Sequence, residues 1–167
     1  VAAFRRKAPS YRCDPAAFGR RFREVEEWRG VAVLIRQTAR FPMACVADGV
    51  AFRNSILAGF EREGITAEML AAYLNASPVR WFHYVRHRDA RQGMPQLKIG
   101  HLRALPAPAE DREGRARLAE MGARWSARNE GITWEEQRAL DQVVGDLLGL
   151  DGEERALVAA WAATFVK

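Results

Sequence analysis

The spacing of apolar residues in this 167-residue chain changes near residue 66. Before that point the apolar stretches are short and predict strands. Val31–Thr38 begins as a continuous apolar run rich in β-branched residues, which predicts a buried strand. Met43–Leu57 contains two apolar stretches around Asp48-Gly49, a dipeptide that tolerates positive φ, and so predicts a β-hairpin. Further upstream, Asp14–Gly30 places its apolar residues on one helical face and predicts a helix.

Two consecutive helices are predicted after this change. Thr66–Ser77 has an apolar stripe at helical spacing, and Thr66 is a favourable N-cap. Ser77–Arg88 begins a second helix, with Ser77 as its cap and Pro78 in its first turn. The apolar face of this second helix is expected to hold Trp81, Phe82 and Val85.

The next segment is predicted to be a strand that two prolines bring to an end. Leu97 and Ile99 alternate with polar neighbours, a pattern typical of a strand with one buried face. Pro106 and Pro108 cannot donate a backbone hydrogen bond, so regular structure is expected to stop there. Pro106–Ala109 is therefore predicted to be a boundary.

Beyond this boundary the pattern predicts helices alone. Their expected ranges are about Asp111–Arg128, Trp134–Leu148 and Gly152–Phe165. Capping boxes are expected at two of the starts, formed by Thr133 with Glu136 and by Asp151 with Glu154. We thus predict a mixed α+β fold, in which a small β-sheet with a hairpin and packed helices is followed by a helical C-terminal segment.

Charge divides the chain at the same place. Residues 1–105 contain 18 Lys and Arg against 9 Asp and Glu, a net charge of +9. Residues 106–167 contain 8 against 12, a net charge of −4. We therefore expect a basic domain in residues 1–108 and an acidic helical segment in residues 109–167. Such an imbalance predicts a polyanionic partner for the first part.

Several classes of protein are excluded on composition. No apolar run approaches the roughly 20 residues of a membrane span, and no signal peptide precedes the first helix, so no membrane partner is expected. Cys13 and Cys45 do not have metal-ligand spacing. We expect two thiols in a reducing cytoplasm, with a disulfide between them as the alternative. Because the first residue is Val1, we expect the chain to be a piece of a longer protein.

No catalytic centre, cofactor site or metal site is predicted in this piece. His83 and His87 have the spacing of two metal ligands on a helix, but Tyr84 stands where the zincin pattern requires Glu. A catalytic zinc site needs three protein ligands, and no third lies nearby in sequence. A metal-dependent hydrolase using these two histidines is therefore the last-ranked alternative. No hydrolase triad motif and no glycine-rich phosphate loop are found.

Two basic segments are the stronger signal. One is Arg36–Arg40, at the end of the predicted buried strand, and the other is Arg86–Lys98, between a helix and a strand. Arg and Gln can bind guanine and adenine edges, and both also contact phosphates. The alternative is that both segments are ordinary solvated loops. The residues expected to contact DNA are Arg36, Gln37, Arg40, Arg53, Arg86, His87, Arg88, Arg91, Gln92 and Lys98.

The order of several short motifs resembles the TaqI-like C-terminal specificity domain of adenine-specific DNA methyltransferases and fused restriction–modification enzymes. The motifs are Arg36-Gln37-Thr38, Asn54-Ser55, Leu74-Asn75-Ala76-Ser77 and the run from Gln96 to Pro108. Ala76 is a departure, because the family often has Asn-Ser directly. The resemblance covers Val31–Pro108, and more loosely the Asp141–Trp161 tail.

The resemblance implies sequence-specific recognition of double-stranded DNA, with no chemistry in this piece. The parent chain would be an S-adenosylmethionine-dependent adenine methyltransferase, with or without endonuclease activity. Its methyltransferase domain, a second partner, would hold the cofactor and the flipped adenine. The alternative from another class is a protein-interaction module whose helical tail mediates assembly.

Overall fold

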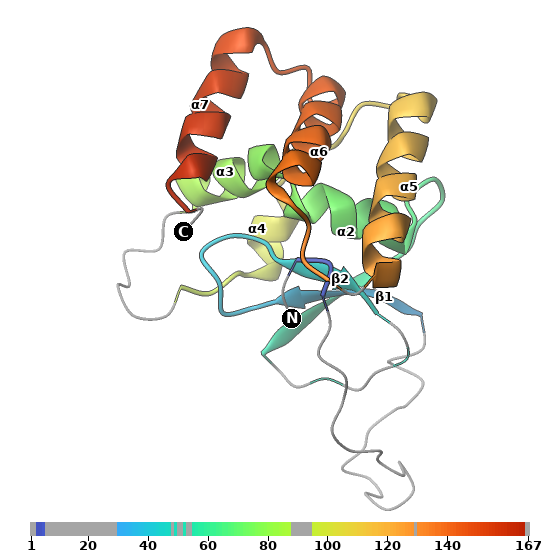
Figure 1. The fold of residues 1–167 in the computed structure, drawn as a ribbon. Coiled ribbons are helices and arrows are strands. Elements are labelled where there is room, and N and C mark those ends of the chain that lie inside the picture. Colours follow the sequence, from blue (N-terminus) through green and yellow to red (C-terminus); the bar gives the residue numbers. More distant parts are fainter. Residues whose placement is uncertain are drawn as a thin grey trace, which may run out of the picture.

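The computed structural model describes residues 3–5, 30–47, 49, 52, 55–87, 95–128 and 130–165. These residues form a mixed α+β fold, as predicted, with a three-stranded antiparallel sheet and six helices (Figure 1). The strands are β1 (Val31–Arg36), β2 (Ala44–Val46) and β3 (Ile56–Phe60). The helices are α2 (Ala67–Asn75), α3 (Ser77–Arg86), α4 (Ile99–Arg103), α5 (Arg112–Arg128), α6 (Trp134–Leu147) and α7 (Gly152–Ala163). The predicted helix at Asp14–Gly30 lies outside the described residues, apart from Gly30.

The sheet has β1 at its centre, in the order β2-β1-β3. Val33 pairs with Val46 of β2, and Leu34 pairs with Ala58 of β3. The predicted hairpin of β2 with β3 is therefore wrong, although both strands exist. β1 is the most buried strand, and a strand buried on both faces needs a hydrogen-bonding neighbour at each edge.

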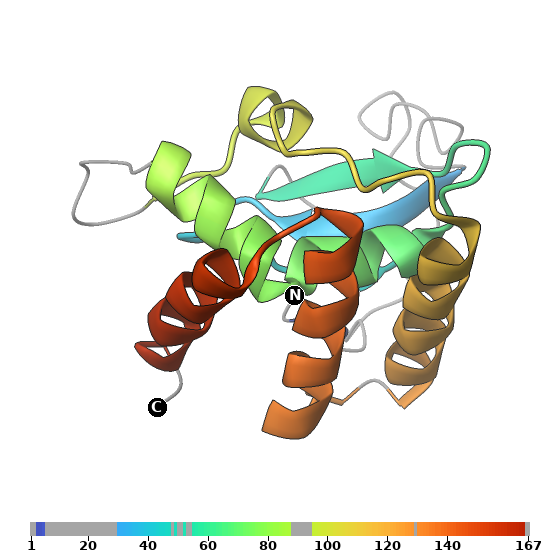
Figure 2. The same cartoon turned by 90° about the horizontal axis from the view of Figure 1, so that it is seen from above.

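Helices cover one face of this sheet in two tiers. α2 packs against β1 and β2, and α5 packs on α2. Figure 2 shows α5, α6 and α7 on the side of α2 and α3 that faces away from the sheet. α7 contacts α3, so α2 and α3 form the layer between the sheet and the last three helices.

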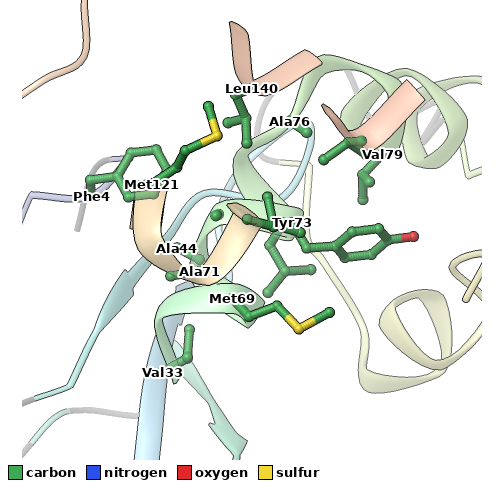
Figure 3. Packing of buried hydrophobic residues seen from close by; sticks show 14 of the residues in the cluster. Phe4, Val33, Ala44, Met69, Ala71, Tyr73, Ala76, Val79, Met121 and Leu140 are labelled. Carbon is green, nitrogen blue, oxygen red and sulfur yellow. The ribbon is translucent and has the colours of Figure 1, made fainter. Parts of the chain in front are cut away.

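One core cluster joins the sheet to the helices (Figure 3). Val33 and Ala44 contribute from the sheet, and Met69 and Tyr73 from α2. Trp125 of α5 is fully buried in the same cluster and meets the ring of Phe4 edge-on. Residues from both sides of Pro106–Ala109 thus share one core. Cys45 is buried, whereas Cys13 lies outside the described residues.

The C-terminal helices begin where their capping boxes predict. Thr133 Oγ1 accepts a bond from the Glu136 N–H, and the Glu136 carboxylate accepts one from the Thr133 N–H. Asp151 and Glu154 make the same reciprocal pair at the start of α7. Thr66 likewise caps α2, by accepting from the Met69 N–H. Among the described residues, no helix combines the length and apolar character needed to cross a bilayer.

The predicted cap of α3 is wrong, and its predicted apolar face is only partly buried. Ala76 is the N-cap residue, while the Ser77 N–H donates to Asp141 of α6 at 2.7 Å. Val85 is 57% exposed and Trp81 and Phe82 are partly buried, whereas His83 is among the buried residues of the helix. Because a histidine occupies the buried face, apolar spacing alone does not identify that face.

The predicted strand around Leu97 is also wrong. Gln96 makes a single bridge to Thr38, and the short helix α4 begins three residues later at Ile99. Leu97 is fully buried as expected, but Ile99 is exposed. A longer ladder cannot form because the segment that pairs with Gln96 makes a tight turn at Thr38, where the Ala39 N–H donates to the Gln37 carbonyl.

Candidate nucleic-acid interface

The two basic segments predicted to contact DNA lie side by side. The Thr38–Gln96 bridge joins them, and the Leu97 N–H donates to the Gln37 carbonyl at 2.8 Å. The buried side chain of Leu97 anchors this junction in the core. Two segments about 60 residues apart in sequence are therefore held together by backbone hydrogen bonds and by a core residue.

The C-terminal turn of α3 lies at the same end of the molecule. Figures 1 and 2 both show the loop between β1 and β2, the segment before α4 and the end of α3 gathered there. His83 lies beside the backbone of Arg40, which links α3 to this loop. We call this region the basic end. Its described members from the predicted DNA-contact set are Arg36, Gln37, Arg40, Arg86, His87 and Lys98.

The cations of the basic end face solvent. Arg36, Arg40, Arg86 and Lys98 are exposed, while Gln37 and His87 are partly buried. Within the part of the chain that the structure describes, none of these four cations takes part in a salt bridge. Arg86 lies over the ring of Phe82, 5.7 Å from its centroid. The positive charge here is therefore not neutralised by neighbouring carboxylates of the described chain.

Four members of the predicted set cannot be placed. Arg53, Arg88, Arg91 and Gln92 lie outside the described residues. Arg88, Arg91 and Gln92 belong to the stretch of chain between the end of α3 and Pro95, so both ends of that stretch lie in the basic end. Their contribution to DNA contact stays a prediction.

A histidine cluster at the basic end was missed by sequence reasoning. His101 of α4 stacks on His87 with ring centroids 4.1 Å apart and planes 6° apart. His83 lies 5.4 Å from His87 and 5.5 Å from His101. Only the pair on α3 has a local sequence signal, because His101 reaches the cluster through tertiary packing.

The surroundings of His83 and His87 favour the neutral imidazole. Burial, helped by His87 and His101, lowers the pKa of His83 to about 4, while the Arg40 backbone acts in the opposite direction. Burial also lowers the pKa of His87, helped by His101 and Arg86. His83 and His87 therefore add little positive charge at neutral pH, and the arginines and Lys98 supply most of the charge of this end.

A network of buried polar side chains, here called the clamp and formed by Asn75, Arg80 and Asp141, supports the basic end. Asn75, at the end of α2, is fully buried and bonds both backbone groups of Ala44, donating to its carbonyl at 2.8 Å and accepting from its N–H at 3.0 Å. Arg80 of α3 donates to Asn75 Oδ1 at 2.8 Å and to the Pro42 carbonyl at 3.0 Å. The clamp thus ties the edge strand β2 and its preceding loop to two helices.

Asp141 of α6 completes this clamp. Burial raises its pKa, while bonds from the Ser77 N–H and from Gln137 Nε2 at 2.8 Å work against the rise. Asp141 and Arg80 also attract one another, since each favours the charged form of the other. A helix of the C-terminal segment therefore helps to hold the loop that carries Arg40.

No family model, curated protein or solved structure matches the chain. The resemblance to a TaqI-like specificity domain accordingly stays a prediction.

Proposed function

We propose that this chain recognises double-stranded DNA in a sequence-specific manner, as the specificity domain of a larger adenine methyltransferase or restriction–modification enzyme. One observation carries the proposal: two basic segments distant in sequence converge, and their described cations are exposed and form no salt bridge with another described residue. Unpaired exposed cations on a rigid support can release counterions from DNA phosphates without first breaking internal ion pairs. Gln37 and Gln96, at the junction, would be suited to adenine edges.

The proposal assigns different tasks to this chain and to its parent. The chain would position DNA through phosphate contacts and read base edges, and it would carry no catalytic residue. A methyltransferase domain of the same parent would hold S-adenosylmethionine and the flipped adenine. The helical C-terminal segment would brace the basic end, as the clamp through Asp141 suggests. A reducing cytoplasm, where such enzymes meet DNA, would be its compartment.

Paired charge reversals test this proposal. Arg36→Glu with Arg40→Glu is expected to weaken binding to a DNA duplex by at least about tenfold, because two phosphate contacts become repulsive. The matched control is Arg112→Glu with Arg117→Glu on α5, where both side chains are also exposed. This control pair lowers the net charge by the same amount, but at a place outside the basic end. Equal weakening by both pairs would show that only net charge matters and would refute the proposed interface.

A second function, assembly with a protein partner through the helical tail, has one observation in its favour. Trp134 and Leu157 are exposed large apolar side chains on α6 and α7. Under this alternative, Leu157→Glu would abolish the partner complex and leave duplex binding unchanged, while the Arg36 and Arg40 reversal would have no effect on the complex. Size-exclusion chromatography of the Leu157→Glu variant and of the Arg36→Glu, Arg40→Glu variant, each mixed with the methyltransferase domain of the parent, distinguishes these outcomes.

A further inference from the structure

All three histidines of the chain meet in one place. The chain has 3 histidines in 167 residues, and the structure brings them together at the ends of α3 and α4. His83 lies in the last turns of α3 and His87 is its C-cap residue, so the two are four residues apart, the spacing at which two side chains of a helix can hold one ion. His101 supplies the third ring from a separate helix, which the sequence spacing alone does not reveal.

Four of the six ring nitrogens of this cluster are buried without a hydrogen-bond partner, although the Arg40 backbone lies close enough to His83 to favour its protonated form. The four are His83 Nδ1, His83 Nε2, His87 Nε2 and His101 Nδ1. His83 is the most enclosed, with 3% of its surface exposed. Buried polar atoms in native proteins nearly always have a partner, so several unpaired ones at a single place indicate a ligand that would satisfy them. A neutral imidazole nitrogen offers a lone pair, which is the ligand that zinc, nickel and cobalt ions accept.

The ring spacing is close to that of a three-histidine site. Two imidazoles on one tetrahedral ion have centres roughly 5 Å apart, since each bonded nitrogen lies about 2.0–2.1 Å from the metal. The His83–His87 and His83–His101 pairs, at 5.4 and 5.5 Å, are near this value. The His87–His101 pair is too close and stacked, so no ligand set among the described residues is already arranged around an ion. Ion binding would require these two rings to part and turn, and the outer torsion of histidine is broad enough to allow such a turn.

We propose that His83, His87 and His101 form a binding site for one divalent ion of the zinc class, with water in the remaining position. The ion would tie the end of α3 to α4 and would replace the unpaired nitrogens with metal bonds. This proposal stands apart from the DNA proposal, because it rests on the histidines and not on the exposed cations.

Titration of the full 167-residue chain with Co²⁺ tests the site. We expect one Co²⁺ per chain, with the intense visible absorption of tetrahedral cobalt, and displacement of that ion by Zn²⁺. His87→Ala and His101→Ala should each lower the Co²⁺ affinity by more than about tenfold, since each removes one ligand. Zn²⁺ should raise the melting temperature of the unaltered chain and leave that of both variants unchanged.

Tyr84→Phe provides the matched control. Tyr84 is next to His83 in α3, but its ring contacts Trp161 and Phe165 instead of the histidines. This variant should bind Co²⁺ as the unaltered chain does. Circular dichroism before titration checks that each variant is folded. The test uses His87→Ala and His101→Ala because these two residues are only partly buried, whereas replacing the buried His83 would disturb the core. Absence of the tetrahedral spectrum, or binding that survives both His87→Ala and His101→Ala, would overturn the proposal.

Discussion

At the scale of single residues, Asn75 shows how one polar side chain can complete a sheet. Its amide gives Ala44 the donor and the acceptor that a neighbouring strand would give, and it does so in the fully buried interior. The sequence places Asn75 inside a helix with an apolar stripe, and nothing in that local pattern indicates a partner 31 residues away. Such a role follows from tertiary packing and could not be predicted from spacing.

Asn75→Ala should destabilise the fold by about 1–3 kcal/mol. The substitution leaves the Ala44 N–H buried without a partner, which costs about this much, and removes one acceptor from Arg80, while the Ala44 carbonyl keeps its bond from the Phe4 N–H. Urea denaturation followed by circular dichroism measures the free energy of unfolding. Asn75→Asp, which keeps the acceptor for the Ala44 N–H and for Arg80, should lose less. A loss below about 0.5 kcal/mol for Asn75→Ala would match an ordinary surface change and contradict the clamp.

Glu136 gives a prediction for the pH dependence of stability. The bidentate bond from Arg128 and the Thr133 N–H lower the pKa of its carboxyl from 4.5 to about 2. Because the pKa is depressed in the folded state, its contribution to stability is complete above pH 4.5 and is lost as the pH falls toward 2. Glu136→Gln keeps a capping side chain without the titration. Its free energy of unfolding should therefore change less than that of the unaltered chain between these pH values, and equal changes would contradict the assignment.

At the scale of elements, the helices were more predictable than the sheet. Capping boxes at Thr133 and Asp151 are local signals, and α6 and α7 begin where these signals place them. Strand order is not local: β2 lies within the predicted hairpin and β3 overlaps it only at Ile56 and Leu57, while the burial of β1 decides that it lies between them. The buried face of α3 was missed because His83, a polar residue, occupies it.

The crossing of α2 and α5 depends on a glycine that no helix pattern would single out. A Cβ atom at Gly122 would lie 2.1 Å from the backbone oxygen of Glu68, a contact that side chains cannot relieve. Gly122→Ala should therefore push the helices apart and cost about 1–3 kcal/mol, although alanine is the better helix former. Gly152→Ala in α7 is the control, since nothing lies within 4 Å of the added atom. Thermal unfolding should show a lower melting temperature for the first variant only, and a stabilised Gly122→Ala would refute the close crossing.

At the scale of the whole molecule, two basic segments that are distant in sequence come together. The segments at Arg36 and Lys98 meet at one end, and the C-terminal helices support that end through the bond from the Ser77 N–H to Asp141. Composition favours a polyanionic partner, which stays a prediction, and it points to the arginines. It could not predict that two segments would join at a single backbone bridge, or that His101 would arrive beside them.

The most direct measurement of the central claim is the affinity of this chain for a DNA duplex as a function of salt concentration. If two or three cations of the basic end engage phosphates, the logarithm of the association constant should fall linearly with the logarithm of salt, with a slope of about −2 to −3. The Arg36→Glu, Arg40→Glu chain should show a slope closer to zero by about 2. An affinity that does not change with salt, or the absence of duplex binding at low salt, would contradict the account.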